Sequence, residues 1–205
     1  MLLIVVSFPF ASEMVKYLIE ITPIKIEDMT VFSPTEFIRL KIYLSLILAI
    51  LISHPLWYRG FYNFSESGLT EKEKKAIVVS FSLGSFLFLI GGLIGLQYLS
   101  PYLIEILLEE EGVISANLSI YQSIKLLVTI SLFSGILTSL PILILLVSDY
   151  LPNKKTLKKY IYILIILVIA LGTPEPSMII NLIFLIFFAA VMEVTLLFTG
   201  TENAN

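Results

Sequence analysis

The chain has 205 residues, of which 58% are hydrophobic and only 14% are charged, and its mean hydropathy is +0.97. Soluble domains carry about 25% charged residues, so this composition excludes an ordinary soluble protein and indicates an integral membrane protein. The lack of cysteine excludes disulfides, thiol nucleophiles and cysteine-based metal sites, and the single histidine, His54, cannot form a multi-histidine cluster. The net charge of −3 says little, because orientation in a membrane follows the placement of Lys and Arg.

The first apolar run covers residues 1–20 and includes Glu13, Lys16 and Glu20. Its uncharged part is short for a membrane span, which needs roughly 20 apolar residues. We interpret it as the outer half of a first membrane helix. A signal peptide would begin with a basic region, which is missing here, so that interpretation is rejected.

A polar loop over residues 22–35 leads into the second helix. Ser33 can cap this helix, Pro34 suits its first position, and Glu36 can close a capping box. The helix is expected to run to about Trp57, with Pro55 marking its exit. The polar stretch that follows, WYRGFYNFSESGLTEKEKK at residues 57–75, is predicted to be a loop at one membrane face.

Thr70 and Glu73 form a second capping box, which opens a helix extending to about Leu108. Such a helix is too long to cross a hydrocarbon layer of about 30 Å without a bend. Gly91, Gly92, Gly95 and Pro101 can supply that bend. Gly91 and Gly95 also form a GxxxG pair, which we interpret as close helix packing within one subunit rather than as a dimerisation motif.

An acidic loop begins at Glu109 and precedes a fourth helix, from about Tyr121 to Val147, that contains Pro141. A lysine-rich loop over residues 148–159 precedes a short fifth helix. The turn Thr173-Pro174-Glu175-Pro176 then leads to a sixth. The predicted membrane spans are residues 1–20, 37–57, 76–104, 123–147, 160–173 and 177–198.

Basic residues gather in the loops at 57–75 and 148–159, which hold eight of the thirteen Lys and Arg residues. Basic loops stay in the cytoplasm, so both loops are predicted to be cytoplasmic. The acidic loop at 109–117 and the turn at 173–176 are predicted to be external.

Three stretches carry a resemblance to a known family: SPTEFIRLKIYLSLILAILISHPLWY, FYNFSESGLTEKEKK, and LGTPEP followed by Glu193 in the last span. In this order the chain resembles the TatC family, the receptor subunit of the twin-arginine protein translocase, from about Pro23 to Phe198. The resemblance implies an all-α integral membrane protein, a cupped bundle of six transmembrane helices. It also implies fifth and sixth helices too short to cross a full bilayer, and against this family the first helix of the chain looks truncated.

The resemblance implies a binding site for the paired arginines of a folded substrate's signal peptide. The family's aromatic residue and glutamate of the first cytoplasmic loop correspond to Phe64 and Glu73, and Glu66 and Glu71 are further candidates. A carboxylate can accept two parallel hydrogen bonds from a planar guanidinium, whereas lysine offers only a point charge. The alternative is that Glu73 only closes its capping box and pairs with neighbouring lysines.

The sequence departs from the family pattern at three places. The amino-terminal amphipathic segment, which ends in Glu and Arg, is missing; it is either absent or lies upstream of a misplaced start. Ser139 stands where many relatives carry a membrane-embedded glutamate, two residues before Pro141. Glu175 precedes Pro176 where the family has proline followed by aspartate. We keep Ser139, Glu175 and Glu193 as candidate polar sites for a partner helix.

Glu193 lies within the last hydrophobic span, where an ionisable group suggests a function, although its position near the cytoplasmic end also suits a structural role. His54 is interpreted as an interfacial polar group rather than a proton relay.

The resemblance implies a non-enzymatic receptor that recruits single-span TatA-type subunits, self-associates in a larger complex and uses the proton gradient. We expect no cofactor, metal or nucleic acid, and a location in the plasma membrane of a prokaryote, with an archaeal source as a weaker expectation. The alternative is a small secondary transporter or channel, but neither a central carboxylate pair nor a repeat is found. An intramembrane enzyme is disfavoured, because no nucleophile and base occur at motif spacing.

Overall fold

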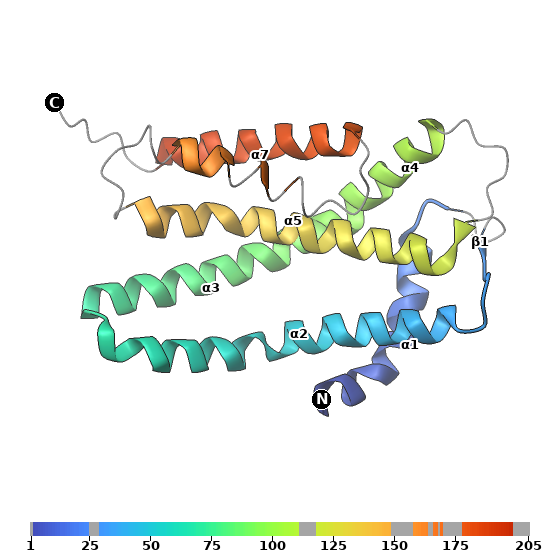
Figure 1. The fold of residues 1–205 in the computed structure, drawn as a ribbon, viewed down its shortest axis with the longest axis horizontal. Coiled ribbons are helices and arrows are strands. Elements are labelled where there is room, and N and C mark those ends of the chain that lie inside the picture. The colour runs from blue at the N-terminus through green and yellow to red at the C-terminus, as the bar shows by residue number, and fades with distance from the viewer. Residues whose placement is uncertain are drawn as a thin grey trace. The chain divides into compact units, whose positions relative to one another are not determined.

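The computed structural model describes residues 2–24, 29–110, 118–148, 158–163, 166–167, 169 and 178–198. Within these ranges the chain is helical apart from short turns and one pair of two-residue strands (Figure 1), which confirms the all-α class. The chain divides into two compact units. One comprises Met1–Glu71 and Ser100–Val128, and the other comprises Lys72–Leu99 and Thr129–Asn205.

Helix α1 is continuous over Leu2–Ile21, with Pro9 inside it. Its bounds agree with the predicted span at residues 1–20, and its interpretation as the outer half of a membrane helix stays a prediction. The charged residues do not end the helix, because they lie on an exposed face: Glu13, Lys16 and Glu20. A second face is buried at helical spacing: Ser7, Ala11, Val15 and Leu18. This face packs on α2, and the Ser7 hydroxyl donates a 2.9 Å hydrogen bond to the carbonyl of Ser45.

Helix α2 spans Glu36–Ser65. It begins two residues after the predicted start at about Pro34, and Thr35, at its N-cap, makes no side-chain capping bond. The Ser33 hydroxyl instead lies 2.9 Å from the Thr35 hydroxyl and accepts a hydrogen bond from the Thr35 backbone N–H. The Glu36 carboxylate turns toward Ser119, whose hydroxyl donates to it across 3.4 Å. Glu36 therefore contacts Ser119, a residue distant in the sequence, instead of capping its own helix.

The predicted exit of α2 at Pro55 is wrong, since the helix continues for ten further residues to Ser65. Proline removes one backbone hydrogen bond but does not have to end a helix when the following turns are otherwise stabilised. Here aromatic contacts span the proline and the turns after it. The His54 and Trp57 rings meet edge to face at 5.0 Å, and the Tyr58 and Tyr62 rings are 6.4 Å apart. The predicted 19-residue loop is thus mostly helix, and the turn itself is short.

Strand β1 (Met29–Thr30) pairs in parallel with strand β2 (Leu118–Ser119), in the register Met29 with Leu118 and Thr30 with Ser119. This pairing was not predicted; it joins the loop before α2 to the residues just before α5. Ser119 then acts as the N-cap of α5, accepting a hydrogen bond from the backbone N–H of Gln122.

Helix α3 (Glu71–Ile94) is followed by a π-helical segment, Gly95–Leu99, and by α4, Ser100–Glu110. The regular α-helix thus changes to a π-helix at Gly95, within the stretch of residues expected to bend it. Pro101 supplies a physical reason. It has no N–H to donate, and its ring clashes with the carbonyl four residues earlier in a regular α-helix, a conflict that the wider π turn relieves.

Helix α5 covers Ile120–Ser148 with Pro141 inside it, close to the predicted fourth helix. It packs tightly on α3 through small residues. A Cβ atom at Gly95 would lie 2.6 Å from the Cβ of Ser134, and the Ser131 hydroxyl donates a 2.8 Å hydrogen bond to the carbonyl of Gly92. The interpretation of Gly91 and Gly95 as a packing motif within the chain is confirmed.

Residues 158–163, 166–167 and 169 are helical, as expected for the fifth helix, whereas the turn at 173–176 lies outside the described residues. Helix α7 spans Met178–Phe198, one residue from the predicted start. Its length is 21 residues. Phe184 of α7 packs edge to face on Phe133 of α5 at 5.1 Å.

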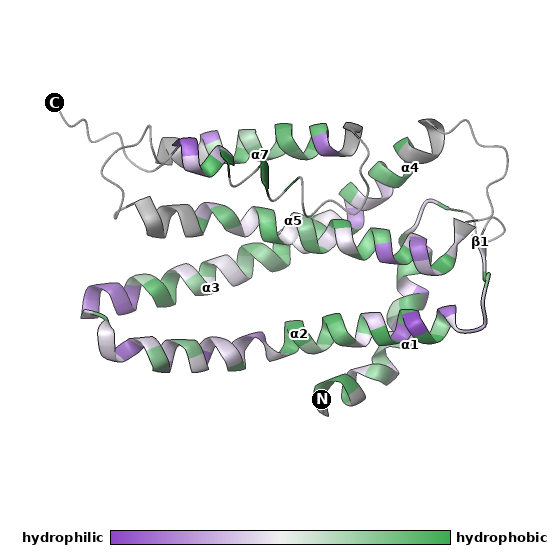
Figure 2. Cartoon of the chain, in the orientation of Figure 1, coloured by the Kyte–Doolittle hydropathy of each residue, from purple (hydrophilic) through white to green (hydrophobic). Residues whose placement is uncertain are grey.

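Three helical stretches among the described residues are long and apolar enough to cross a membrane: Glu36–Gly68, Glu71–Ile106 and Ile120–Ile142. Figure 2 shows the apolar residues along these helices and a hydrophilic first turn in α3. The six-span count remains a prediction.

Candidate functional site

The connection between α2 and α3 carries the sequence-predicted recognition residues. Phe64 lies in the last turn of α2, and 84% of its surface is exposed. A fully exposed phenylalanine is unfavourable in water, so its position suits contact with another apolar group. Arg59 is exposed five residues earlier on the same helix.

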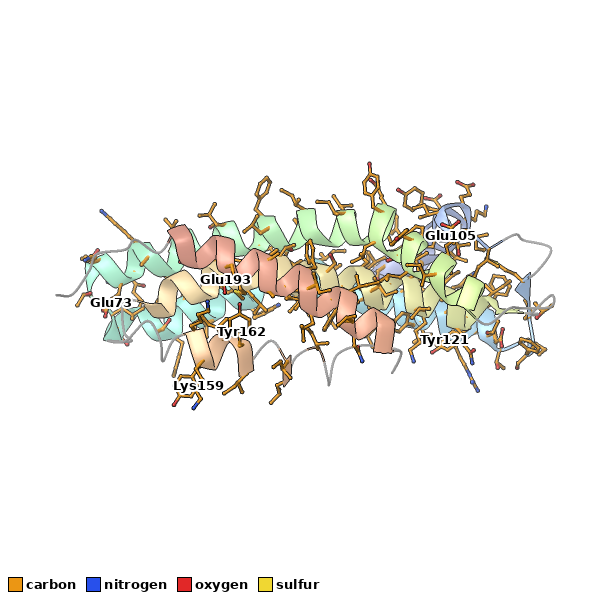
Figure 3. All side chains as sticks on the ribbon, turned by 90° about the horizontal axis from the view of Figure 1, so that it is seen from above. Glu73, Glu105, Tyr121, Lys159, Tyr162 and Glu193 are labelled. Carbon is orange, nitrogen blue, oxygen red and sulfur yellow. The ribbon has the colours of Figure 1, made fainter. Side chains whose placement is uncertain are left out.

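Glutamates follow Phe64 at close intervals. Glu66 opens a 3-10 turn over Glu66–Gly68, where its backbone N–H caps α2 by donating to the carbonyl of Tyr62. Glu71 and Glu73 lie in the first turn of α3 (Figure 3), where the positive end of the helix dipole favours carboxylates. Glu66 and Glu71 are exposed and Glu73 is partly buried. The short turn therefore presents several carboxylates in sequence after one exposed aromatic ring.

The capping role of Glu73 remains a prediction, as does its role toward arginine. Both roles use the same carboxylate. A group at the start of a helix can accept backbone N–H donors, whereas a guanidinium needs both carboxylate oxygens for a bidentate pair.

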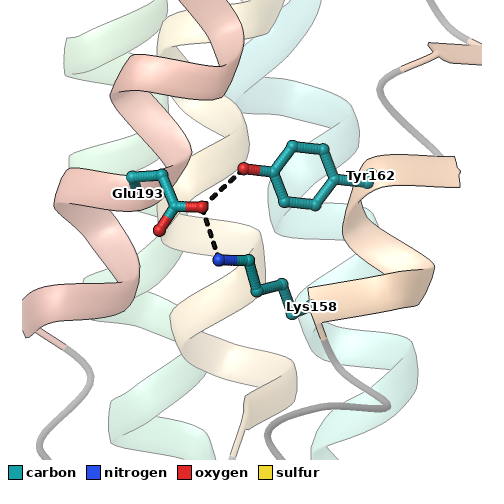
Figure 4. A network of polar contacts seen from close by, with 3 residues as sticks. All are labelled: Lys158, Tyr162 and Glu193. Atoms are coloured by element: carbon teal, nitrogen blue, oxygen red, sulfur yellow. Dashed lines mark hydrogen bonds and ion pairs between the residues drawn. The ribbon is translucent and has the colours of Figure 1, made fainter.

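Glu193 belongs to a polar network near the carboxyl end of α7 (Figure 4). Tyr162 donates a 2.6 Å hydrogen bond to Glu193 Oε1, and Lys158 Nζ lies 2.5 Å from the same oxygen. The side chains of Lys158 and Glu193 are 49% and 48% exposed. The hydrogen bond to the Glu193 carboxylate raises the pKa of Lys158 above its ordinary value. Lys158 belongs to the lysine-rich loop predicted to be cytoplasmic, which agrees with Glu193 lying near that end of its span.

Sequence reasoning identified Glu193 but missed both of its partners. A usable signal exists, because Lys158 and Tyr162 are four residues apart and so share one face once the helix begins at residue 158, two residues before the predicted start. Lys158 Nζ also lies 5.8 Å above the Tyr162 ring, which supports the same arrangement. The network ties helical residues 158–163 to α7.

The other candidate residues named from the sequence contribute less to a binding site. The Ser139 hydroxyl donates to the carbonyl of Ile136 at 2.6 Å within its own helix, so its donor is used locally. Glu175 lies outside the described residues. His54 packs against Trp57 as described above. No group of three or more metal-ligating side chains occurs in the described parts of the chain.

Comparison with known sequences gives a single family. The model of the Sec-independent protein translocase protein (TatC) matches residues 1–192. A TatC protein of Methanocella arvoryzae is 24% identical over 204 residues, which cover 97% of this chain and 85% of the relative. A TatC protein of Helicobacter pylori is 30% identical over 149 residues, which cover 69% of this chain and 58% of the relative.

Solved structures agree on the fold. A crystal structure described as the twin arginine translocase receptor TatC superposes with a TM-score of 0.76 at 20% identity, covering 97% of this chain and 90% of that one. A crystal structure of the same receptor in DDM superposes with a TM-score of 0.77, also at 20% identity, covering 97% of this chain and 92% of that one.

Proposed function

This chain belongs to the TatC family of Sec-independent protein translocase proteins, and on that premise we propose that it is the receptor for paired-arginine signal peptides of folded substrates. As a member of this family it is a membrane-spanning component of a protein translocase in a prokaryotic membrane, and it is not an enzyme. Family membership also argues against the alternative of a small secondary transporter or channel. An archaeal host is favoured only by the Methanocella relative.

The observation that carries this proposal is the strong exposure of Phe64 at the end of α2, directly before the closely spaced glutamates in the sequence. A signal peptide with two arginines brings two planar guanidinium groups, each of which can form a bidentate pair with one carboxylate. Glu73 is proposed as the main ligand, and Glu66 or Glu71 as the ligand of the second arginine. Phe64 packs over the bound arginines, where its ring can stack on a guanidinium plane.

Partner subunits follow from the same premise. Single-span TatA-type subunits are recruited to the loaded receptor, copies of the receptor associate in a larger complex, and the proton gradient drives export. Polar groups near helix ends are candidate contacts for such subunits. Of these, Glu193 is half-exposed and already holds a tyrosine and a lysine, so it can exchange or share partners at low cost.

A peptide-binding measurement tests the proposal. The purified protein, reconstituted in lipid nanodiscs, is titrated with a peptide containing two adjacent arginines and with the same peptide carrying two lysines. We expect the arginine peptide to bind more tightly, because a guanidinium can pair with both oxygens of a carboxylate whereas lysine offers only a point charge. We also expect the affinity of the arginine peptide to fall less with added salt than simple charge attraction gives. Equal affinities for the two peptides would argue against a receptor of this kind.

A further inference from the structure

The last turns of α2 carry a row of exposed aromatic residues, Trp57, Phe61 and Phe64, which we call the aromatic stripe. Their spacing of four and three residues places them on one face of the helix. Trp57 and Phe61 are 55% and 57% exposed, and Phe64 is more exposed still. Three large aromatic rings on one face are a costly arrangement in water.

The same face continues toward the amino end of α2 with aliphatic residues. Ile42, Leu46 and Ile50 repeat every four residues and are all exposed, as expected for a face that meets lipid tails. At 3.6 residues per turn, Trp57 lies about four turns beyond Ile42 on nearly the same side of the helix. The change from aliphatic to aromatic residues along one face is typical of the boundary between hydrocarbon and headgroups.

The length of α2 agrees with this boundary. Lys41 is the last charged residue before the apolar run of the helix, and Trp57 and Phe61 follow it. At 1.5 Å per residue the separation is about 24 to 30 Å, which is the thickness of a hydrocarbon core. If Lys41 lies at the outer interface, as its position predicts, the aromatic stripe begins at the inner one. Arg59, exposed at a similar level on the opposite side of the helix, suits the anionic headgroups of that leaflet.

We propose that Trp57 and Phe61 of the aromatic stripe bind the lipid interface of the cytoplasmic leaflet, at the boundary between acyl chains and headgroups, and that Phe64 lies at the cytoplasmic edge of this contact. The carboxyl end of α2 is then a membrane-anchored segment rather than a free cytoplasmic extension. One consequence rests on the proposed function: the recognition residues that begin at Phe64 lie at the bilayer surface, so the receptor binds a signal peptide that is itself in contact with lipid.

Trp57 is the single tryptophan of the chain, so its fluorescence reports this position without any substitution. The full-length protein is reconstituted in vesicles whose lipids are brominated either near the glycerol or near the chain end. We expect strong quenching of Trp57 by bromine near the glycerol, weaker quenching by bromine at the chain end, and little quenching by iodide in the water. A second protein, with Trp57→Phe and Phe61→Trp, should give the same order.

The matched control places the tryptophan at the same depth on the neighbouring, less exposed face, with Trp57→Phe and Tyr62→Trp. This control should be quenched several-fold less by brominated lipid than the two stripe positions. Equal quenching at all three positions, or quenching of the stripe by iodide rather than by lipid, would overturn the proposal. Iodide quenching that an arginine-pair peptide suppresses would instead make the stripe a peptide surface, which also overturns it.

The bromine measurements contain no peptide, so their failure is independent of the receptor proposal. The stripe can lie in water while the arginine-pair peptide still binds selectively, and it can lie in lipid while both peptides bind equally.

Discussion

A Cβ atom placed on Gly91 would lie 1.8 Å from Oγ1 of Thr138, so α3 and α5 meet with no room for a side chain between them. The Thr138 hydroxyl uses this closeness to donate a 3.0 Å hydrogen bond to the carbonyl of Leu87 on α3. On the other side of the contact, a Cβ atom at Gly135 would lie 2.7 Å from the Phe88 carbonyl oxygen. Both helices therefore contribute glycine to one interface.

The first prediction is that Gly91→Ala destabilises the protein. The new methyl group must displace Thr138 and break its bond to α3, and overpacking of this kind costs about 1 to 3 kcal/mol. Gly84→Ala on the same helix is the matched control, because nothing lies within 4 Å of its added Cβ. It should be neutral, or stabilising by up to about 1 kcal/mol through helix propensity. Thermal unfolding of the detergent-solubilised variants measures both, and equal midpoints would contradict the packing.

The second prediction concerns the ion pair of Lys158 and Glu193. Because both side chains are about half-exposed, the pair should contribute to stability only within the small range that solvent-exposed ion pairs give. A double-mutant cycle with Lys158→Met and Glu193→Gln gives its coupling energy from the unfolding of four proteins. Tyr162→Phe extends the cycle to the hydrogen bond. A coupling energy well above this range would mean that water is excluded from the network.

The positions of the helices could be predicted from the sequence because long apolar runs and their polar boundaries are local features. Helices α5 and α7 begin and end close to the predicted residues. The exit of α2 could not be predicted in the same way. Pro55 and a polar composition both favour a loop. In the structure the helix continues, and two aromatic pairs lie along it: His54 with Trp57, and Tyr58 with Tyr62. The members of each pair are three or four residues apart, which is helical spacing. This helical spacing is hard to recognise in the sequence, because the residues that show it are aromatic and polar rather than aliphatic.

Contacts between segments distant in sequence were the least predictable part. The pairing of Met29 with Leu118 joins two-residue strands, which are too short to show an alternating pattern. The partners of Glu193 lie some thirty residues away along the chain, so only the shared face of Lys158 and Tyr162 hinted at them. Phe64 and Glu73 were identified as recognition residues only through the resemblance to the family. By themselves, an exposed phenylalanine and a glutamate at the start of a helix are common structural features.

The third prediction is the sidedness of the loops. Because the chain contains no cysteine, single cysteines can be introduced and probed in whole cells with a thiol reagent that does not cross the membrane. Cysteines at Ala116 and Val31 should be labelled, since β1 and β2 pair and must lie on the same side. A cysteine at Ser67, in the α2–α3 turn, should be labelled only after the cells are opened. The reverse pattern would invert the topology and remove the cytoplasmic recognition site.

The fourth prediction is that Glu73→Lys abolishes export of arginine-pair substrates, whereas Glu73→Gln weakens peptide binding without abolishing it. Reversal places like charges in contact, while glutamine retains a hydrogen-bonding side chain and loses only the charge-assisted part, about 1.5 to 3 kcal/mol. Peptide affinity is measured in nanodiscs and export in cells. Glu105→Lys, at an exposed position in α4, is the matched control for a charge reversal elsewhere and should leave affinity unchanged.

A purely capping role for Glu73 predicts a different outcome for the same two variants. Loss of a helix cap costs about 1 kcal/mol of stability, so the amount of protein in the membrane would fall while the affinity of each remaining molecule stayed the same. Protein level and peptide affinity must therefore be measured on the same membranes. If Glu73→Lys accumulates normally and binds the arginine peptide as tightly as the unaltered protein, Glu73 is not a ligand. Glu66 and Glu71 would then be the carboxylates to test.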